Sequence, residues 1–463
     1  MEEVNTNMDL HTFLEELKKD RPYDILEVNK RVDPFLEVST VLWHLEMANK
    51  NLVTVFNSVN NLKGAKSTFK VVTNIFASRD RCAYILNTNP ESISQKYGEL
   101  ERKTIEPVIV KPEDAPVKDV VKKDDEVNLS ELPIIQHHER DAGPYITAGV
   151  CVAKHSTYGY NAAILRLQYK NLRKLGVFMI PGKHTDLYFK CYKESGKDMP
   201  IAIVIGHHPR FYLGSQTTQP IEVDEYKVIG GVMGKPLRLT HSESLGKDFL
   251  IPADAEIVIE GKVLVDVEEP EGPFGEFSRY YGYQVERGRV IEVTAINMKK
   301  DAIYQDIFAG HADHIILGAI PIEAKLLYEL RRAYSSIKNV HLPLSGGGRF
   351  TCYIQIKKNF EGETKNILLA VLGIHNSIKL AVTVDEDINI FDESQIMWAL
   401  ATRAKFSENI FVIPKCQRIS LDPVPSNFSD KLGIDATFPL DKRMETLKPP
   451  EKYKQISFED YLK

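Results

Sequence analysis

Apolar positions near the start of the chain recur three or four residues apart, which is the spacing of one face of a helix. The apolar residues of the first such run are Leu10, Phe13, Leu14 and Leu17. Asp9 stands directly before this run and is the expected N-cap. A second helix is predicted after Asp33, with Pro34 at its first position, where a missing N–H costs nothing. Its apolar residues are Phe35, Val38, Val41, Leu42 and Leu45.

Short β-branched runs bounded by Gly or Pro predict strands along much of the remaining chain. They cover residues 52–56, 69–72, 201–205, 256–260, 263–267 and 290–296. Because these runs follow one another closely from about residue 143, we expect a barrel or sandwich there rather than a doubly wound parallel sheet. Residues 104–128 hold three prolines and mixed charge, which predicts a solvated connector or a loosely attached strand.

The pattern changes to alternating helix and strand from about residue 320, which indicates a separate α/β domain. Helices are expected over 322–335 and 392–405, and strands over 352–357, 367–372 and 379–384. Asp392 and Gln395 have the spacing of a capping box at the start of the later helix. The charged segment 441–463 predicts a surface arm that ends in a short helix.

Length and composition narrow the class of protein. A chain of 463 residues exceeds one ordinary core, so we expect two or three domains, and 43% hydrophobic with 27% charged residues is typical of a folded globular protein. The net charge of −5 argues against nucleic acid as a partner. No apolar run reaches the ~20 residues that span a bilayer, so no membrane is expected either. Five scattered cysteines without C-x-x-C spacing, and an N-terminus without a signal-like apolar region, favour the cytoplasm.

Several common catalytic motifs are absent from the sequence. It contains no G-x-S-x-G elbow, no H-E-x-x-H helix and no G-x-G-x-x-G fingerprint. Residues 230–236 approach a phosphate-binding loop, but the glycine spacing is one residue short and Pro236 replaces the hydroxyl residue that would bind magnesium. A serine hydrolase, a zincin and a Rossmann dehydrogenase are therefore disfavoured. The three glycines at 346–348 predict a tight turn.

An acidic segment around a Gly-Pro-Phe-Gly turn is the most unusual local sequence. Glu271 and Glu276 bracket this turn, so both carboxylates can point into one cleft. Two neighbouring carboxylates do not both ionise easily, so one can stay protonated near neutrality and act as an acid. The alternative is a solvent-exposed acidic hairpin, because charged runs are usually solvated.

Three further pieces of sequence carry polar side chains of complementary chemistry. Asn161 and Arg166 are five residues apart, so on a regular strand they face opposite sides unless a bulge intervenes; the alternative is an edge strand with polar ends. Asn161, His184 and Glu225 offer an amide oxygen, an imidazole nitrogen and a carboxylate, a set that suits manganese or magnesium. The alternative for His184 is an ordinary surface or core histidine. Spacing alone does not show that these residues meet.

Taken in this order, these pieces resemble the UbiD family of reversible decarboxylases, which includes the ferulic acid and 4-hydroxybenzoate decarboxylases. The resemblance covers nearly the whole chain and is most specific in 251–261 (IPADAEIVIEG), 271–276 (EGPFGE), 384–403 and 433–437 (GIDAT). It implies an α/β fold with an N-terminal α/β prenylated-FMN-binding domain containing a split β-barrel, a linker helix and a C-terminal α/β oligomerisation domain. The implied boundaries are 1–115 for the N-terminal α/β part, 116–310 for the barrel, 311–340 for the linker helix and 341–463 for the dimerisation domain and tail.

The resemblance also implies the chemistry: reversible non-oxidative decarboxylation of an aromatic, heteroaromatic or α,β-unsaturated carboxylic acid, with release or capture of carbon dioxide. Prenylated FMN would come from a separate flavin prenyltransferase, and Mn²⁺ or Mg²⁺, with K⁺ near by, would hold its phosphate. By motif, the metal ligands are Asn161, His184 and Glu225, and the catalytic network is Arg166, Glu271 and Glu276, with Glu276 as general acid. The implied cofactor-binding residues are Asn161, Ala162, Ala163, Ile164, Leu165, Arg166, Lys183, His184, Glu225 and Lys379. The family also implies a homodimer or homohexamer.

The sequence departs from the family pattern at several positions. Arg279 lies where many relatives carry Thr-Gly, and a cation there favours a substrate with a second anionic or polar group. Ala162 stands where some relatives have Trp beside potassium, which puts a potassium site around 214–215 in doubt. The segment from His311 to His314 favours a structural loop over a pocket lining. The competing functions are a decarboxylase of an aliphatic isoprenoid-precursor enoate, a non-catalytic flavin-binding protein and an NAD(P)H-dependent flavin oxidoreductase.

Overall fold

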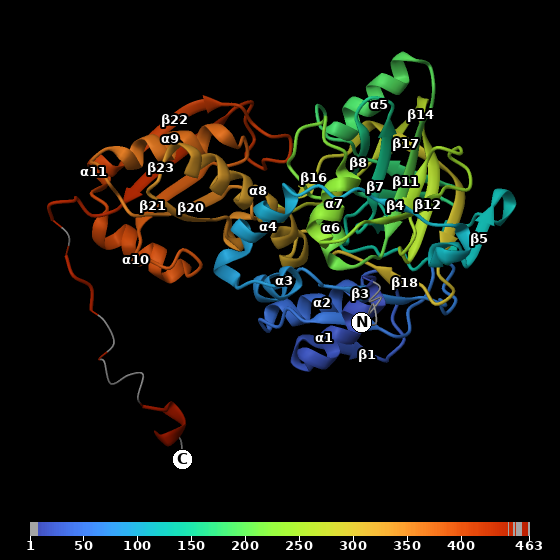
Figure 1. Ribbon diagram of the computed structural model, residues 1–463, viewed down its shortest axis with the longest axis horizontal. Coiled ribbons are helices and arrows are strands. Elements are labelled where there is room, and N and C mark those ends of the chain that lie inside the picture. Colours follow the sequence, from blue (N-terminus) through green and yellow to red (C-terminus); the bar gives the residue numbers. More distant parts are fainter. Residues whose placement is uncertain (1–7, 443, 448–449, 451–455, 462–463) are drawn as a thin grey trace.

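The computed structural model describes residues 8–442, 444–447, 450 and 456–461. Figure 1 shows an N-terminal part and a central β-rich part packed together, and a C-terminal α/β part that is reached through the long helix α8 (Ala312–Ala333). Among the described helices, none is both long and apolar enough to cross a membrane.

A mixed four-stranded sheet forms the N-terminal part. Its order is β1-β2-β3-β18, with β2 and β3 antiparallel and the two outer pairs parallel. The elements are α1 (Leu10–Asp20), β1 (Ile25–Val28), α2 (Glu37–Met47), β2 (Val53–Phe56), β3 (Lys70–Thr73), α3 (Arg79–Leu86), α4 (Ile93–Glu101) and, far along the chain, β18 (Ile303–Gln305). Asp9 caps α1 as predicted, because its carboxylate accepts the Thr12 backbone N–H at 2.9 Å.

The second helix begins later than the sequence pattern predicts. Leu36 has a φ of 65°, in the left-handed region, so the chain does not run helically from Pro34 through this residue. Helix α2 therefore starts at Glu37, and the prediction that Pro34 opens it is wrong. Val38 and Leu42 are buried on α2, as the apolar spacing predicts.

The central part is built on a nine-stranded sheet whose pairings are antiparallel. Its order is β6-β9-β10-β17-β14-β11-β7-β8, and β5 also pairs with β17. The strands are β5 (Val120–Lys123), β6 (Tyr145–Ile146), β7 (Val150–His155), β8 (Gly159–Ile164), β9 (Leu167–Asn171), β10 (Lys174–Val177), β11 (Met199–Ile205), β14 (Ile257–Glu271) and β17 (Val285–Met298). A β-rich unit distinct from a doubly wound sheet is confirmed. Within the described chain, no pairing between the end strands β6 and β8 closes it into a barrel.

Two predicted strands are in fact one. The predicted run 256–260, from residue 257 on, and the run 263–267 both fall in β14, which pairs with β17 along most of its length. The register shifts between Glu260 and Gly261, which marks a bulge where the sequence pattern predicts a break.

Smaller elements complete the central part. They are β4 (Val108–Ile109), α5 (His184–Glu194), α6 (Pro209–Gly214), α7 (Glu225–Met233), β12 (Arg238–His241), β13 (Leu250–Pro252), β15 (Phe274–Gly275) and β16 (Tyr281–Gly282). The connector 104–128 contributes β4 beside β12 and β5 beside β17. It is therefore attached to the sheets at two places.

The C-terminal part is a five-stranded sheet with helices, in the order β19-β20-β21-β23-β22. Its elements are β19 (Ile337–His341), β20 (Thr351–Ile356), α9 (Glu363–Ile374), β21 (Leu380–Asp385), α10 (Glu393–Arg403), α11 (Phe406–Asn409), β22 (Ile410–Cys416) and β23 (Ser429–Ala436). The predicted α/β alternation is confirmed. Of the tail, the described residues 458–461 form a short 3-10 helix.

Three predictions for this part are wrong in detail. The run 367–372 lies in α9 rather than in a strand; a short apolar run fits a buried strand and a buried helix equally well. Helix α8 starts ten residues before the predicted position 322 and carries Pro321 inside it. At α10 the Asp392 side chain accepts the Ser394 N–H as an N-cap, but Gln395 Oε1 accepts from the Asn389 N–H instead of closing a capping box.

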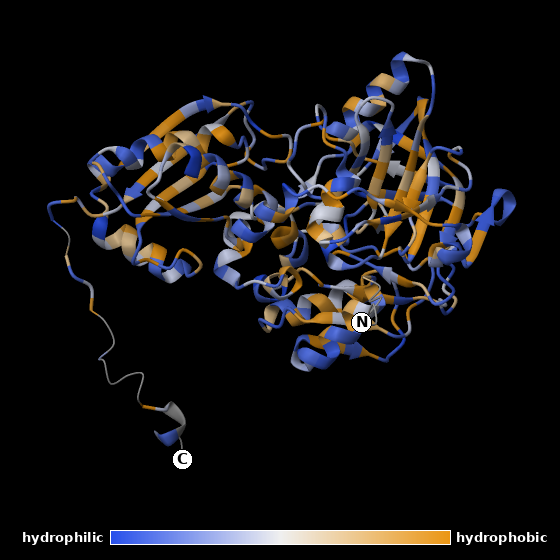
Figure 2. Ribbon diagram, viewed as in Figure 1, coloured by the Kyte–Doolittle hydropathy of each residue, from blue (hydrophilic) through white to orange (hydrophobic). Residues whose placement is uncertain are grey.

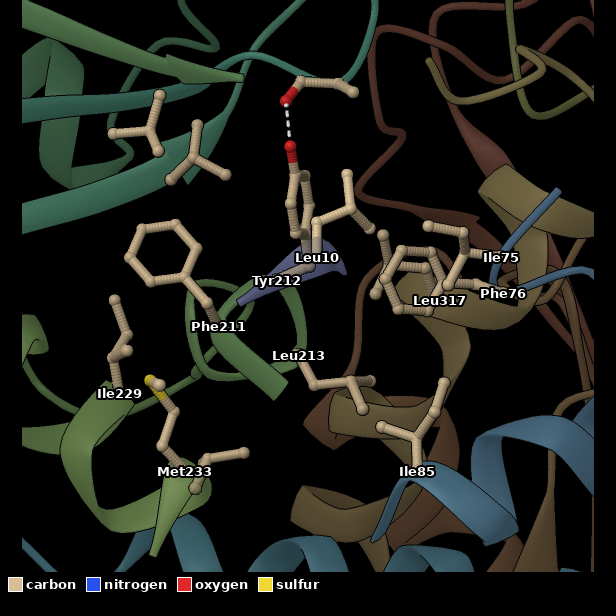
Figure 3. Packing of buried hydrophobic residues seen from close by; sticks show 14 of the residues in the cluster. Leu10, Ile75, Phe76, Ile85, Phe211, Tyr212, Leu213, Ile229, Met233 and Leu317 are labelled. Atoms are coloured by element: carbon tan, nitrogen blue, oxygen red, sulfur yellow. Dashed lines mark hydrogen bonds between the residues drawn. The ribbon is translucent and has the colours of Figure 1, made fainter. Parts of the chain in front are cut away.

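Figure 2 shows that hydrophobic residues are concentrated along the strands of the central and C-terminal sheets, and many of these residues are buried. Figure 3 shows the cluster in which residues of α1, α6, α7 and α8 pack around Phe211 and Tyr212. The buried Tyr212 hydroxyl donates to the Ala148 carbonyl at 2.9 Å, so its polar atom is satisfied within the core.

Candidate active site

The guanidinium of Arg166 lies between the carboxylates of Glu271 and Glu276. Nε donates to Glu271 Oε1 at 3.0 Å, Nη2 donates to Glu271 Oε2 at 2.6 Å, and Nη1 donates to Glu276 Oε1. Arg166 follows the end of β8, Glu271 ends β14 and Glu276 follows β15. Because β8 stops at Ile164, strand alternation no longer governs where Arg166 points, and it can reach carboxylates from two other segments.

This network is almost closed to solvent. The side chains of Arg166, Glu271 and Glu276 are 8%, 1% and 8% exposed, so the alternative of a solvent-exposed hairpin is wrong for these two carboxylates. Burial raises the pKa of Glu276, and attraction to Arg166 opposes that rise. Burial also disfavours the charge of Arg166, but the two glutamates outweigh it and raise the pKa of the guanidinium. A permanent cation therefore stands beside a carboxyl group that protonates more readily than an ordinary glutamate.

A cavity of about 270 Å³ lies beside this network. Most of its lining is apolar: Ile164, Leu165, Phe178, Ile180, Phe274, Phe277, Ile307, Ala309, Leu317, Gly318 and Leu421. Its polar lining residues are Thr147, Arg166, Gln216, Glu276, His314 and Arg349. The guanidinium carbon of Arg166 lies 4.4 Å from the centroid of the Phe178 ring, which fixes the cation at the wall. A largely apolar cavity with a few converging polar groups is typical of a small-molecule site.

The structure also brings together Asn161, His184 and Glu225, which come from β8, the start of α5 and the start of α7. Glu225 Oε1 accepts from Asn161 Nδ2 at 2.9 Å and lies 3.3 Å from His184 Nδ1. Glu225 Oε2 accepts the Ala162 N–H at 2.6 Å. Burial raises the pKa of Glu225, and the hydrogen bond with His184 opposes this rise.

The chemistry of this second cluster fits a hard divalent cation. It offers a carboxylate, an imidazole and an amide, and the Asn161 amide is placed with Oδ1 accepting from the Thr185 hydroxyl at 2.7 Å. A hydroxyl can accept as well as donate, so a rotated amide keeps Thr185 as its partner while turning its oxygen toward Glu225. Within the described residues no group of three or more His, Cys, Asp and Glu side chains forms a metal cluster, so the amide is needed as the third donor here.

The remaining predicted cofactor residues are placed differently. Ile164 and Leu165 line the cavity, whereas Ala162 and Ala163 do not. Lys183 is exposed at the N-terminus of α5. Lys379 precedes β21, and its ammonium donates to Asp422 Oδ1 at 3.0 Å. It stands close to Leu421, which lines the cavity, but is not itself in the lining.

The sequence analysis missed three polar residues of the cavity wall, Thr147, Gln216 and Arg349, and assigned a fourth, His314, to a structural loop. Arg349 follows the glycines at 346–348, and desolvation lowers its pKa to about 10. Its Nη1 donates to the Gly348 carbonyl at 2.9 Å, and among the described residues no carboxylate forms an ion pair with it. Burial lowers the pKa of His314 to about 3, so this imidazole is neutral at pH 7. The structural loop favoured by the sequence analysis is therefore wrong for His314, which lines the cavity from the first turn of α8. The sequence signal for a site there was the pair His311 and His314, three residues apart.

Arg279 does not occupy the place that the sequence analysis gave it. Its guanidinium pairs with Glu46 on α2, which also contacts His311 Nδ1, and its side chain is half exposed. Arg279 is not among the lining residues of the cavity. The second cation of the site is Arg349, which comes from the C-terminal part of the chain.

Three family models match this chain in succession. The N-terminal, Rift-related and C-terminal domains of 3-octaprenyl-4-hydroxybenzoate carboxy-lyase match residues 15–101, 108–312 and 315–436. Together they cover most of the sequence, including every residue of the Arg166 network and of the Glu225 cluster.

Named relatives point in two chemical directions. Anhydromevalonate phosphate decarboxylase of Methanothermobacter thermautotrophicus is 34% identical over 82% of this chain and 88% of its own length. Gallate decarboxylase of Lactiplantibacillus plantarum is 28% identical over 98% of this chain and 99% of its own length.

Among solved structures, the UbiD-class enzyme HmfF from Pelotomaculum thermopropionicum superposes with a TM-score of 0.91 in complex with FMN (35% identity, 98% of this chain and 100% of that one). An evolved dimeric form in complex with prFMN gives 0.88 (33% identity, with the same coverage).

Proposed function

Since the chain belongs to the UbiD family of carboxy-lyases, we propose that it decarboxylates an aromatic, heteroaromatic or α,β-unsaturated acid reversibly and without oxidation. The observation that carries this proposal is the Arg166 guanidinium, held between two buried carboxylates at the wall of a cavity. Arg166 orients the substrate carboxylate by a charge-assisted contact at the cavity wall. Glu276 in its acid form donates a proton to the carbon that loses carbon dioxide, and Glu271 holds Arg166 in place.

The proposed cofactor is prenylated FMN, supported by the FMN and prFMN complexes of a structural relative. When bound, this flavin supplies an electron sink for the charge left as carbon dioxide departs. Asn161, His184 and Glu225 are proposed to hold Mn²⁺ or Mg²⁺ against its phosphate, with Ile164 and Leu165 beside it. A separate flavin prenyltransferase is proposed to supply it. We further propose that the domain boundaries lie near residues 115, 310 and 340. The protein is proposed to assemble into a homodimer or homohexamer and to act in the cytoplasm.

The finer proposal concerns the substrate: an acid that carries a second anionic group. Arg349 is a desolvated cation at the cavity wall, and its ion-pair partner is not supplied by the described protein residues. Burying a guanidinium without an anion costs free energy, which a substrate phosphate or second carboxylate would offset. His314 Nδ1 accepts the Gly310 N–H at 3.3 Å, so in the neutral imidazole Nε2 carries the proton and can donate to the same anion.

The buried Arg349 guanidinium helps to choose between the two kinds of acid that the names of the relatives describe. A phosphate is part of the named substrate of the anhydromevalonate phosphate decarboxylases, whereas gallate has one carboxylate and neutral hydroxyls. The aliphatic alternative, a phosphorylated enoate, is therefore as well supported as an aromatic or heteroaromatic diacid. A simple phenolic monoacid is the least favoured substrate.

Anaerobic co-expression with a flavin prenyltransferase, followed by a carbon dioxide release assay, tests the proposal. Acids would be supplied in pairs that differ only in the second anion: a furan or benzene diacid beside its monoacid, and a phosphorylated enoate beside its alcohol. We expect kcat/KM to be at least about 10-fold higher for the anionic member of one pair, the effect of one charge-assisted hydrogen bond. Turnover of monoacids with equal efficiency would contradict the second-anion proposal, and absence of carbon dioxide release from all of them would contradict the decarboxylase assignment.

A further inference from the structure

Asp141 is a buried carboxylate that lies behind the catalytic turn instead of facing the cavity. It is 7% exposed, and within the described part of the chain it enters no ion pair. Its oxygens accept two backbone N–H groups: Oδ1 from Gly275 at 2.8 Å and Oδ2 from His138 at 2.9 Å. Burying a carboxylate without an ion-pair partner costs free energy, which these two amide donors and the neighbouring His137 partly offset.

One of these two donors is the residue directly before Glu276. Gly275 packs closely against the His138 ring, because a Cβ at this position would lie 2.2 Å from His138 Cδ2. The same turn makes a further contact, in which the Ala142 N–H donates to the Pro273 carbonyl at 2.9 Å. Residues 138–142 therefore form a rigid backing for the segment that carries Glu276.

The opposite side of that segment is held by its own hairpin. The Glu276 N–H donates to the Tyr280 carbonyl at 3.0 Å, and Gly310 leaves only enough room for the Glu276 carbonyl, since a Cβ there would lie 2.9 Å from it. The backbone of Glu276 is therefore held from both sides, and from this position its carboxylate contacts Arg166. A misplacement of about 1 Å at such a group can cost about 100-fold in rate.

We propose that Asp141 is a positioning residue, which fixes the Gly275 amide and thereby holds the Glu276 carboxyl group against Arg166. This inference rests on the proposed function, since it concerns how the acid of that reaction is held. Asp141 itself touches neither the cavity nor the reacting atoms.

The substitution Asp141→Asn separates positioning from mere folding. The Asn oxygen still accepts one N–H, but its NH₂ group faces the other N–H and cannot accept it. The turn then loosens and Glu276 loses part of its contact with Arg166. Because Arg166 opposes the burial that raises the pKa of Glu276, a weaker contact lets that pKa rise further. The alkaline limb of the plot of kcat against pH therefore moves to higher pH. A variant that merely contains less folded enzyme would show a lower kcat at every pH, with the limb at the same position.

The experiment compares cofactor-loaded wild type, Asp141→Asn and Asp392→Asn. The last is a matched control, since Asp392 also accepts a backbone N–H but caps α10, where Asn serves equally well. For Asp141→Asn we expect kcat to fall about 10- to 100-fold, KM to change less than about 3-fold, and the alkaline limb to shift upward. Backbone amide hydrogen exchange in residues 272–278 should be faster in Asp141→Asn than in wild type, whether or not the enzyme is turning over substrate.

The possible failures are distinguishable. An inactive wild type on every acid contradicts the proposed function, while unchanged exchange in 272–278 contradicts the role of Asp141 whatever the activity. Unchanged kcat and pH profile also overturn it. If Asp141→Asn does not fold, Gln168→Leu takes its place, since Gln168 Nε2 donates to the Ala142 carbonyl at 2.7 Å and anchors the segment 138–142 that backs the turn. That variant should show the same direction of change, and no change would overturn the inference.

Discussion

Arg166 grips Glu271 with two donors at once, Nε to Oε1 at 3.0 Å and Nη2 to Oε2 at 2.6 Å. A planar guanidinium makes such a fork, whereas an ammonium group makes a point contact. Glu271 thereby fixes the plane of the guanidinium, and the third nitrogen, Nη1, is left to meet Glu276 at the cavity.

Replacement of Arg166 by Lys tests the need for this fork. The charge remains, but two of the three contacts are lost, so we expect kcat/KM to fall by about 100-fold or more with the flavin still bound. Arg289→Lys is the matched control, because Arg289 also pairs with a glutamate, Glu268, but away from the cavity. Carbon dioxide release measures both. Activity of Arg166→Lys within a few-fold of wild type would show that only the charge matters.

The pH dependence of decarboxylation should follow Glu276. Its pKa is raised by burial, so the acid form persists to higher pH than in an ordinary glutamate and is lost as pH rises through the raised value. Decarboxylation is therefore expected to be full on the acid side of that value and to decline on the alkaline side. Glu276→Gln, which carries no such proton, should lower kcat by about 10²- to 10⁴-fold and flatten this limb. A limb that stays in the Gln variant belongs to another group.

Substitution of Arg349 by Met should weaken binding only of substrates that carry a second anionic group. We expect KM for a diacid or phosphorylated acid to rise about 10- to 100-fold, the loss of a charge-assisted hydrogen bond, with little change for the matched monoacid. Arg279→Ala is the control, because Arg279 pairs with Glu46 and is not part of the cavity lining. Steady-state kinetics on the paired acids measures the change in KM for each member of a pair. Equal losses for both members of a pair would remove Arg349 from substrate recognition.

Loss of His184 should weaken retention of metal and flavin together. His184→Ala removes one of the three proposed metal ligands, the others being Asn161 and Glu225. We therefore expect the amounts of Mn²⁺ and flavin bound per chain to fall by about 10-fold or more after dialysis. Elemental analysis and the flavin absorbance report this without any turnover. His44→Ala, on the exposed face of α2, should leave both unchanged. Full retention in His184→Ala would separate this cluster from the cofactor.

Glu323 links the N-terminal part to the C-terminal part and should govern acid stability. Burial opposes its charge, but attraction to Arg79 and the hydrogen bond with His341 outweigh burial and lower its pKa to about 2. A carboxylate with a lowered folded-state pKa stabilises the protein above its unfolded pKa, and this contribution is lost as pH falls from about 4.5 toward about 2. Glu323→Gln should cost about 3–5 kcal/mol at pH 7, the usual effect of breaking a buried pair.

Chemical denaturation at pH 7 and pH 3 measures this effect. The difference between Glu323→Gln and wild type should shrink at the lower pH. Glu329→Gln, on the same helix but with a side chain 40% exposed, should change stability by less than about 1 kcal/mol. A constant difference at both pH values would mean that Glu323 acts through packing instead of charge.

The sequence by itself determined which chemistry is present and much of the local structure. The spacing around Leu10 and the cap at Asp9 specified α1, and β-branched runs specified strands such as β11, because these depend on neighbours close along the chain. The EGPFGE motif and its partners carried the family resemblance and with it the Arg166 network. Local signals failed where a single backbone angle or a distant contact decides, as at Leu36 before α2 and in the apolar run of α9.

Only the tertiary structure decided which charges face the cavity. Arg279 lies three residues after Glu276, yet Glu46 of α2 holds it elsewhere, whereas Arg349, more than 70 residues after Glu276, reaches the wall from the C-terminal part. Pairing and burial depend on segments far apart in the chain, and no local pattern encodes them. The same holds for Asp141: the hydrogen bond that it accepts from the Gly275 N–H of the catalytic turn forms only when the turn and the segment 138–142 are packed together, whereas the one from the His138 N–H is local.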